Sequence, residues 1–556
     1  MKKIIFLLST SLISLFSYSQ TTLISNVQGY TLQQAANTSD PTQLIKFHAI
    51  QFTDDRIDKI YLEGEAIPKR NNIQTINGQG KTLLPGFIDA HGHVLSYGLS
   101  LLRVDLTKTT SELDAVNRVK NYSDKNTNLA WIQGRGWNQV QWPDKQFPTA
   151  KTLDKLFPNT PVWLKRIDGH AGWANSKAMA LAGINAKTES PAGGSIIKDR
   201  DGKASGVFID NAMNLIDQAI PALTIEEQKS VLTKSMQALA SFGLTSVHDA
   251  GISQLNINAY QMLANEKKMP IRINAMLDIT DDNWQTILKN GHLKSSDDFF
   301  TLNSIKISAD GALGSRGAAL IDDYSDKHNH KGLLLHSNDM LSTYMATAMN
   351  AGFQVNTHAI GDNANNIVLN LYEKHISATK SQKLRHRIEH AQVLQLSDIP
   401  RFNKLNVIAS MQATHATSDK NMAVERLGKQ RILGAYAWRK LLNEQAIIAA
   451  GSDFPIESPN PLFGLHASIT RQDHNNLPEQ GWYPKEKMTV VEAFKSFTLD
   501  AAYSGHQEKI IGSLAKGKKA DFVLISDNIF TMPEQKIWQN EILATWVNGQ
   551  QVYKKQ

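Results

Sequence analysis

Eight short apolar runs, most of them separated by segments of helical length, constrain the fold of this chain more than any other feature. In chain order the runs cover 85–91, 244–248, 271–277, 304–307, 353–358, 387–390, 407–411 and 446–450. Segments such as 225–242 and 338–351 lie between them and are long enough for helices. A regular alternation of strand and helix makes the strands parallel, with helical crossover connections. The sequence therefore predicts an α/β protein, a (β/α)8 TIM-like barrel.

An open doubly wound sheet is the alternative arrangement for eight parallel strands. When such a sheet binds a dinucleotide, a glycine-rich phosphate-binding turn follows its first strand. No turn of that kind follows the run 85–91. The glycine-rich segment 311–317 lacks the lysine of a phosphate-binding loop, so it predicts a tight loop at the mouth of the barrel. We therefore favour the barrel over the open sheet.

The segments outside the strand–helix units predict the other domains. The stretch 107–223 is too long for one crossover connection, so we expect an inserted subdomain after the first strand. Strand-like segments at both ends of the chain predict a composite β-sandwich built from 20–84 and 504–556. This leaves 85–106 and 224–503 for the barrel. Two unrelated terminal appendages are the alternative to the sandwich.

Half of the ten tryptophans lie in the predicted insert. They are Trp131, Trp137, Trp142, Trp163 and Trp173. Large aromatic side chains usually fill cores, which would give the insert a small core of its own. In the alternative interpretation the insert is a lid over the barrel mouth, and some of these rings line the substrate pocket. On that second interpretation Trp137 is a candidate substrate-binding residue.

The amino-terminal residues have the pattern of a secretory signal peptide. Lys2 and Lys3 precede a short apolar stretch, and the small residues Ser17 and Ser19 predict cleavage before Gln20. The apolar stretch is too short and too rich in serine for a transmembrane helix. We therefore expect a signal peptide over 1–19 and a periplasmic or secreted mature protein without a membrane anchor.

Charge and composition exclude several classes of function. The 59 basic and 52 acidic residues are interspersed, and no long run of lysine and arginine could follow a phosphate backbone, so no nucleic-acid partner is expected. The chain has no cysteine, which excludes disulfides, thiolate metal sites and a cysteine nucleophile. A chain of 556 residues exceeds the size at which a single core keeps growing, so two or more packed units are expected.

Six potential metal ligands lie at or near the ends of the predicted strands. They are His91, His93, Lys306, His358, His390 and Asp453. In a (β/α)8 barrel the carboxyl ends of all the strands meet at one face, where active sites lie. Imidazole nitrogens, a carboxylate and a modifiable lysine at that face can hold one or two divalent ions beside a reactive water. The pattern predicts a metal-dependent hydrolase.

The motifs around these residues resemble the amidohydrolase superfamily. The segment 85–93, Pro-Gly-Phe-Ile-Asp-Ala-His-Gly-His, is similar to the signature of its first strand. The ends of its fourth, fifth, sixth and eighth strands and its return to a β-sandwich resemble 305–307, 357–358, 388–392, 451–455 and 512–523. Two further segments, 309–316 and 168–176, look like amidohydrolase family 3, the branch that includes YtcJ-like proteins and N-substituted formamide deformylases.

The resemblance implies an activity and a ligand set. It implies hydrolysis of a carbon–nitrogen bond other than a peptide bond, in an amide or formamide, by a metal-activated hydroxide. A first ion would be held by His91, His93 and Asp453, and a second by His358 and His390. The expected partner is a small-molecule amide, and the sequence leaves a homo-oligomer open.

The resemblance also implies roles for single residues. Lys306, carboxylated on its side-chain nitrogen, would bridge two zinc ions, whereas its plain alternative is an ion pair with Asp310 or Asp453. Asp453 would act as general base and then as general acid. His170 and Arg316 are candidates for holding the substrate, with a turn histidine and a surface arginine as the alternatives.

Two other functions stay open at this stage. In a mononuclear deaminase of the same superfamily, His91, His93, His358 and Asp453 would bind one ion while His390 faces the substrate. In a non-catalytic metal- or ligand-binding barrel, the ligands would serve binding alone. Four other histidines we interpret as structural, since a lone histidine at a strand end is more often hydrogen-bonded than metal-bound. These are His248, His386, His415 and His466.

Overall fold

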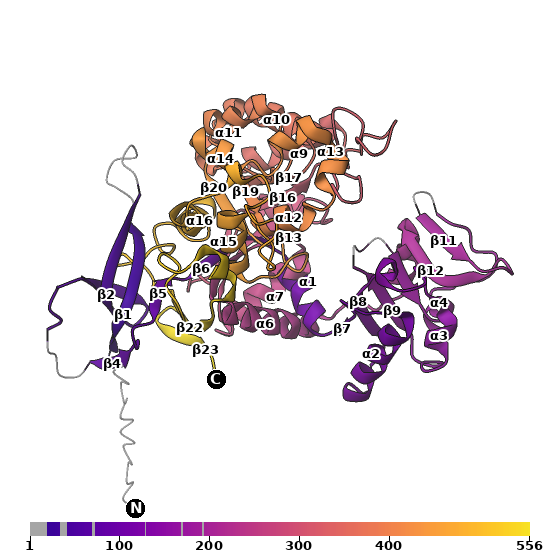
Figure 1. The fold of residues 1–556 in the computed structure, drawn as a ribbon, viewed down its shortest axis with the longest axis horizontal. Coiled ribbons are helices and arrows are strands. Elements are labelled where there is room, and N and C mark those ends of the chain that lie inside the picture. The colour runs from indigo at the N-terminus through magenta and orange to yellow at the C-terminus, as the bar shows by residue number, and fades with distance from the viewer. Residues whose placement is uncertain are drawn as a thin grey trace, which may run out of the picture.

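Three β-sheets organise the chain (Figure 1). The computed structural model describes residues 19–33, 42–68, 73–127, 129–167, 169, 171–191 and 194–556. In Figure 1 the sheet made from the two ends of the chain lies to the left of the barrel, and the insert lies to its right. The predicted signal peptide lies outside the described residues, apart from Ser19.

The central sheet consists of eight parallel strands joined by helical connections, which confirms the predicted barrel. Around the barrel these are β6 (Phe87–Gly92), β13 (Leu244–Ile252), β14 (Arg272–Asp278), β16 (Phe300–Ser308), β17 (Gln354–Ala359), β18 (Arg387–His390), β19 (Ile408–Gln412) and β20 (Ile448–Gly451). The short β15 (Leu293–Lys294) pairs antiparallel with β16 at its start. Each of the eight apolar runs in the sequence forms one strand of the barrel.

The barrel closes where its first and last strands end. The backbone N–H of Asp453 donates to the His91 carbonyl at 2.7 Å, and the N–H of His93 donates to the Phe454 carbonyl at 2.9 Å. Gly451 lies so close to β6 that a Cβ on it would lie 2.6 Å from the His91 nitrogen. Closure therefore brings His91, His93 and Asp453 together although more than half of the chain separates them.

Helices cover the barrel and connect its strands. They are α1 (Val94–Leu101), α6 (Ile225–Ser241), α7 (Gln254–Asn265), α8 (Trp284–Asn290), α9 (Asn338–Asn350), α10 (Asp362–Thr379), α11 (Ile399–Leu405), α12 (Ala413–Asp419), α13 (Ala423–Arg431), α14 (Trp438–Asn443), α15 (Pro461–Thr470), α16 (Val490–Ser496) and α17 (Leu499–Ser504). The helix α6 shows how the sequence sets these elements: a capping box of Thr224 and Glu227 starts it, and Leu232, Met236 and Leu239 form its buried face. Within the described ranges, no helix is long and apolar enough to span a bilayer.

Between α1 and α6 the chain forms a second sheet of six strands. In order across the sheet these are β11 (Gly194–Lys198), β12 (Ala204–Asp210), β10 (Ala171–Ala174), β9 (Val162–Arg166), β8 (Ile132–Trp137) and β7 (Val104–Asp105). The helices of this unit, which we call the insert, are α2 (Glu112–Lys125), α3 (Ala150–Asp154), α4 (Ser176–Leu181) and α5 (Asn214–Asp217). Trp137, Trp142, Trp163 and Trp173 are all buried in apolar clusters of the insert. These rings therefore fill the insert's own core.

The third sheet combines the two ends of the chain. In sheet order its strands are β23 (Gln550–Lys554), β22 (Ile542–Val547), β21 (Phe522–Ile525), β5 (Thr82–Pro85), β1 (Thr21–Gln33), β2 (Gln43–Thr53) and β3 (Arg56–Leu62), with β4 (Gln74–Asn77) beside β1. The two ends meet where β21 pairs antiparallel with β5. A fully buried ion pair between Arg272 of the barrel and Asp521, with 2.9 Å between Nε and Oδ2, fastens this sheet to the barrel.

Candidate metal centre

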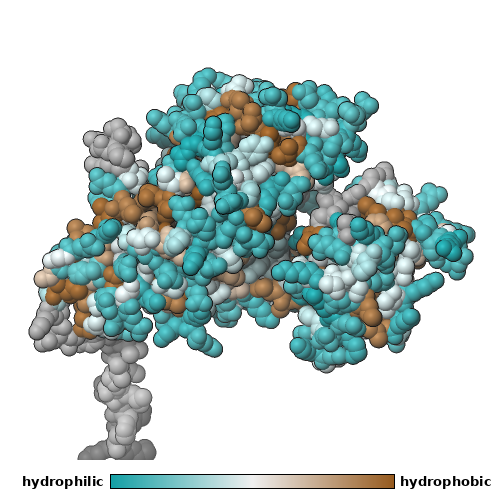
Figure 2. Space-filling view, in the orientation of Figure 1, coloured by the Kyte–Doolittle hydropathy of each residue, from teal (hydrophilic) through white to brown (hydrophobic). Residues whose placement is uncertain are grey.

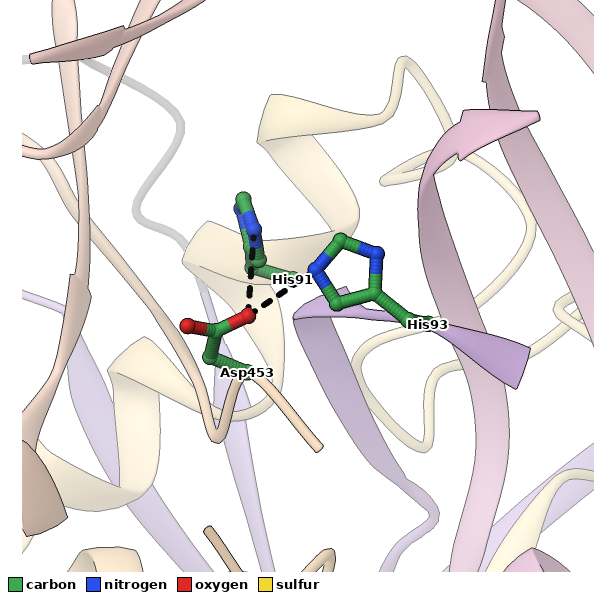
Figure 3. Close-up of side chains that lie close together, drawn as sticks. All are labelled: His91, His93 and Asp453. Carbon is green, nitrogen blue, oxygen red and sulfur yellow. Dashed lines mark hydrogen bonds and ion pairs between the residues drawn. The ribbon is translucent and has the colours of Figure 1, made fainter. Parts of the chain in front are cut away.

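Three of the predicted ligands converge at the mouth of the barrel. The Nε2 atoms of His93 and His91 lie 3.0 and 3.6 Å from Oδ1 of Asp453. Figure 3 shows both rings turned toward this carboxylate, the histidines at the end of β6 and the aspartate just past β20. Ligand atoms of the three residues lie within 4.8 Å of one another, which is the spacing of a shared ion.

His91 is held in the orientation and tautomer that a metal ligand needs. Its Nδ1 lies 2.5 Å from Oε2 of Glu389, while its buried Nε2 has no hydrogen-bond partner among the described atoms. Burial lowers the pKa of His91 to about 4, so the ring is neutral at physiological pH. Nδ1–H then donates to Glu389, and the Nε2 lone pair faces Asp453 and is available to a cation.

A buried arginine fixes Glu389 in turn. Nε of Arg387 lies 2.8 Å from Oε1 of Glu389. Arg387 also donates to the Ala90 carbonyl at 2.6 Å, to Oγ of Ser410 at 2.8 Å and to Nδ1 of His248 at 2.9 Å. Although burial opposes ionisation, Arg387 and His91 lower the pKa of Glu389, which is therefore a carboxylate. Residues of four barrel strands, β6, β13, β18 and β19, thus hold Arg387 and, through it, the Glu389 carboxylate that orients His91.

A second group of possible ligands contains His415, a histidine predicted from the sequence to be structural. Ligand atoms of His390, His415 and Asp453 lie within 4.8 Å of one another. Nε2 of His415 is buried, has no hydrogen-bond partner among the described atoms and lies 3.6 Å from Oδ2 of Asp453. Nδ1 of His390 lies 2.7 Å from Oε1 of Gln412, which leaves its other nitrogen for this group. The one sequence signal that could have identified His415 is its position just after the seventh strand.

His358 and Lys306 complete the set of predicted ligands at the mouth. Nε2 of His358 lies 3.4 Å from Oδ1 of Asp310 without hydrogen-bond geometry, and its ring packs edge-on against that of His390 at 4.5 Å. Asp310 is itself buried and accepts the backbone N–H groups of Ile360 and Gly361. This carboxylate therefore limits how the His358 ring can turn.

Lys306 projects into the same cavity as the histidines. Burial lowers the pKa of its ammonium, although Glu389 and Asp453 oppose that shift. The side chain makes no hydrogen bond or ion pair with any residue that the structure describes, Asp310 and Asp453 included. A buried lysine without a carboxylate partner can lose its proton, which is the condition for carboxylation.

Of the three candidate substrate-binding residues, two do not line this cavity, and the third lies outside the residues that the structure describes. His170 lies outside the described residues. Arg316 is paired with Asp326, with 2.9 Å between Nη2 and Oδ2. The Trp137 ring is fully buried in the insert and donates its Nε1–H to the Leu164 carbonyl at 2.8 Å. The structure therefore corrects the role of Trp137: its ring contributes to the insert's core, because packing with its neighbouring rings leaves none of it exposed.

A large cavity connects the metal ligands with the insert. Its volume is about 1410 Å³, and the insert stands beside the barrel with a hollow between them (Figure 2). The barrel contributes the histidines, Lys306 and Asp453, together with the tight loop Ala312–Ser315. The other wall includes Arg103, Arg135 and Ile167. The cavity is large enough for a substrate that extends well beyond a single scissile bond.

The donor set fits a divalent cation. Three imidazole nitrogens at the mouth, Nε2 of His91, His358 and His415, are buried and have no hydrogen-bond partner among the residues that the structure describes. Buried polar atoms are rarely left unpaired, because each one costs free energy. Imidazole nitrogens beside a carboxylate suit zinc, and also manganese, iron or cobalt.

Three relatives match most of the chain. It is 33% identical over 494 residues to protein LONG AFTER FAR-RED 3 of Arabidopsis thaliana, which covers 86% of this chain and 83% of that protein. It is 32% identical to the putative amidohydrolase YtcJ of Bacillus subtilis, over 90% of this chain and 97% of that one. It is 25% identical to the N-substituted formamide deformylase of Arthrobacter pascens, over 89% and 92% of the two chains.

The comparison with solved structures identifies the same fold. An uncharacterized metal-dependent hydrolase from Pyrococcus horikoshii OT3 superposes with a TM-score of 0.75 over 93% of this chain and 99% of that one, at 23% identity. The sequence model of the amidohydrolase family matches residues 74–553. With the barrel, the ligand cluster at its mouth and this match in place, the chain belongs to the amidohydrolase family.

Proposed function

We propose that the protein is a metal-dependent amidohydrolase that cleaves a carbon–nitrogen bond, in an amide or formamide, other than a peptide bond. The observation that carries the proposal is the convergence of His91, His93 and Asp453 at one end of a large cavity. The formamide deformylase among its relatives supports this bond type.

The residues at the barrel mouth divide into two ligand sets in this proposal. His91, His93 and Asp453 would hold the first ion, and His358 with His390 would hold the second. Lys306, carboxylated on its side chain, would be a ligand of both ions, and zinc is the expected metal. When bound, such ions lower the pKa of a water and polarise the scissile carbonyl.

Asp453 moves the proton in the proposed reaction. Although burial opposes it, the hydrogen bond from His93 and the nearby rings of His91 and His390 hold the pKa of Asp453 well below its ordinary value. The group is therefore a carboxylate at neutral pH and can accept the proton of the attacking water. It can then deliver that proton to the leaving nitrogen, whose departure as an amine requires it.

The second candidate function is a mononuclear deaminase of the same family. It would use His91, His93, His358 and Asp453 for one ion and leave His390 for the substrate. Two ions are favoured because His390, which the deaminase would leave for the substrate, lies within reach of a shared ion with Asp453 and His415. A non-catalytic barrel is disfavoured because the proposed base is in place beside the ligands.

The cellular location and the partners of the protein belong to the same proposal. The signal-peptide pattern at 1–19 supports export, so we propose a periplasmic or secreted protein. Its partner would be a small-molecule amide, without nucleic acid or membrane, and a homo-oligomer is compatible with it.

Metal content per chain tests the proposal. Protein purified without chelator is analysed by plasma mass spectrometry, together with the variants Lys306→Ala and Lys289→Ala. We expect two ions per chain, a loss of one or both in Lys306→Ala, and no loss when Lys289, a lysine of α8 outside the cavity, is replaced. One ion in all three proteins would favour the deaminase, and no transition metal at all would refute a metal-dependent hydrolase. Release of amine from N-benzylformamide, N-acyl amino acids and cyclic amides then tests the bond type.

A further inference from the structure

Arg103 lies at the junction between the barrel and the insert. It follows α1, which begins directly after His93, and precedes β7, the insert strand that pairs with β8. Its backbone is therefore anchored on one side by a helix of the barrel and on the other by a strand of the insert. The side chain is half-buried and lines the cavity that contains the metal ligands.

Within the described part of the chain, the guanidinium of Arg103 has no partner of opposite charge. Among the residues that the structure describes, it forms no ion pair and no side-chain hydrogen bond. The carboxylate that attracts it most is Asp217, which already binds Nζ of Lys165 and Nε1 of Trp163, each at 2.9 Å. Asp105, two residues further on, accepts the Thr107 N–H at 2.8 Å.

The surroundings of Arg103 partly exclude water from its guanidinium but do not neutralise the positive charge. Burial lowers the pKa of its guanidinium below the ordinary value, and the attraction of Asp217 opposes this shift only in part. Apolar side chains, Leu101, Ile167 and Ile456, line the same cavity. A partly desolvated cation with no counter-ion costs free energy, which an anionic ligand group would recover.

A pocket for an aromatic substituent would be the alternative to a site for an anionic group. The tryptophans of the insert do not form such a pocket. Trp137, Trp142, Trp163 and Trp173 are between 0 and 2% exposed, and none of them lines the cavity. The insert side of the cavity instead carries two arginines, Arg103 and Arg135, together with Asp105, Thr107, Asn138 and the aliphatic Ile167.

We propose that Arg103 binds a carboxylate at the far end of the substrate. The preferred substrates are then ω-amino acids that carry an acyl or formyl group on the amino nitrogen and keep the carboxylate free. The proposal rests on the proposed function, which places the scissile bond at the metal ligands. The guanidinium forms two parallel hydrogen bonds with a carboxylate, a geometry that neither a neutral amide nor an ester reproduces.

The helix α1 sets the length of such a substrate. It has eight residues and starts next to His93, so its ends are about 12 Å apart. From this backbone separation we expect a carboxylate directly beside the scissile amide to fall short of Arg103. An extended aliphatic spacer of several methylene groups would reach it, and the spacer would pass the apolar side chains that line the cavity.

The test compares acids and their neutral counterparts. Metal-loaded protein is titrated calorimetrically with N-formyl-ω-aminocarboxylates of increasing chain length and with the matching carboxamides, and the cell contents are analysed for formate and free amine. The variants are Arg103→Met, which removes the charge, and the matched control Arg200→Met. Arg200 is an exposed arginine of the insert, at the turn between β11 and β12 and outside the cavity.

We expect wild type to bind the acid at least tenfold more tightly than the carboxamide, with a maximum at an intermediate length. Arg103→Met should lose that preference while its affinity for the carboxamides stays unchanged, and Arg200→Met should retain it. Equal affinity of wild type for acids and carboxamides, no binding of either series, or a preserved preference in Arg103→Met would overturn the inference. Selective binding without release of formate or amine would instead contradict the proposed hydrolysis and leave the carboxylate site standing.

Discussion

A few buried side chains decide whether His91 is a metal ligand or an ordinary core histidine. Its Nδ1 is occupied by Glu389, and Glu389 is held by Arg387. Groups of this kind, which act on a ligand without touching the ion, typically change metal affinity by 10- to 100-fold when they are altered. At this scale the candidate site depends on Glu389 as much as on the ligands themselves.

Replacing Glu389 by Gln should weaken metal binding. The substitution keeps the shape of the side chain but removes its negative charge. That charge strengthens the hydrogen bond from Nδ1–H of His91 and pairs with Arg387. We expect metal affinity to fall by about 10- to 100-fold in competition with a chromogenic chelator. Glu373→Gln is the control, because Glu373 is an exposed residue of α10 that pairs with Arg401 and Lys404. Unchanged affinity in Glu389→Gln would show that His91 does not need this acceptor.

Pairs of elements show how neighbouring strands and helices are kept in place. At the start of β18, Nδ1 of the buried His386 accepts the Val355 N–H of β17 at 3.0 Å, and its Nε2 lies 3.0 Å from Oγ of Ser381. On the outer layer, Gly98 of α1 lies against α6, where a Cβ would come within 2.6 Å of the Val231 carbonyl oxygen. Each contact predicts a measurable loss of stability.

His386 should make the protein less stable in mild acid. Burial lowers its pKa to about 3 in the folded chain, whereas the unfolded chain has the ordinary value of about 6.5. The unfolded state therefore binds more protons between these two values, so the contribution of His386 is complete above pH 6.5 and is lost as the pH falls toward 3. Between pH 7 and pH 5 this amounts to about 2 kcal/mol.

Urea unfolding at the two pH values measures this effect. The loss of unfolding free energy from pH 7 to pH 5 should be smaller in His386→Gln than in wild type by about 2 kcal/mol. His328→Gln is the control, because His328 is an exposed histidine outside the barrel strands. An equal pH dependence in wild type and His386→Gln would contradict the assignment.

Gly98→Ala should disturb the packing of α1 on α6. The new methyl group would meet backbone of α6, which cannot rotate away as a side-chain tip would. We expect a loss of about 1–3 kcal/mol in the free energy of unfolding, typical of overpacking. Ser96→Ala, at an exposed position of the same helix, should cost no stability. The helix also connects His93 with Arg103, so its displacement would reach the cavity.

The whole molecule is held together by contacts between sheets from distant parts of the chain. Arg272 belongs to β14, whereas Asp521 directly precedes β21 of the terminal sheet, and both side chains are buried. Arg272 also donates to Asn548, which follows β22. One guanidinium thus joins the barrel to two carboxy-terminal segments.

Removing one partner of this ion pair should cost much more than removing an exposed one. Asp521→Ala leaves the Arg272 charge buried without its carboxylate, and breaking a buried pair in this way costs about 3–5 kcal/mol. Asp124→Ala breaks an exposed pair with Lys120 and should cost less than about 1 kcal/mol. Melting temperatures of the two variants provide the comparison, and similar values would show that the terminal sheet does not depend on Asp521.

The sequence by itself determined the elements and most of the candidate ligands. Apolar runs alternating with helical segments are a local signal, and for that reason all eight barrel strands were predictable. The positions of His91, His93 and Asp453 at strand ends were equally readable, because all parallel strands of a barrel end at the same face.

Only the tertiary structure decided which side chains share a space. It brought His415 to Asp453, directed Arg316 to Asp326, enclosed the Trp137 ring in the insert and left Arg103 facing the cavity. Nothing local distinguishes these outcomes, because a histidine after a strand or an arginine after a helix has the same sequence signature whether its partner is a ligand, a carboxylate or water. Distances between elements that are far apart in the chain determine such contacts, and these distances exist only once the barrel has closed and the insert has packed.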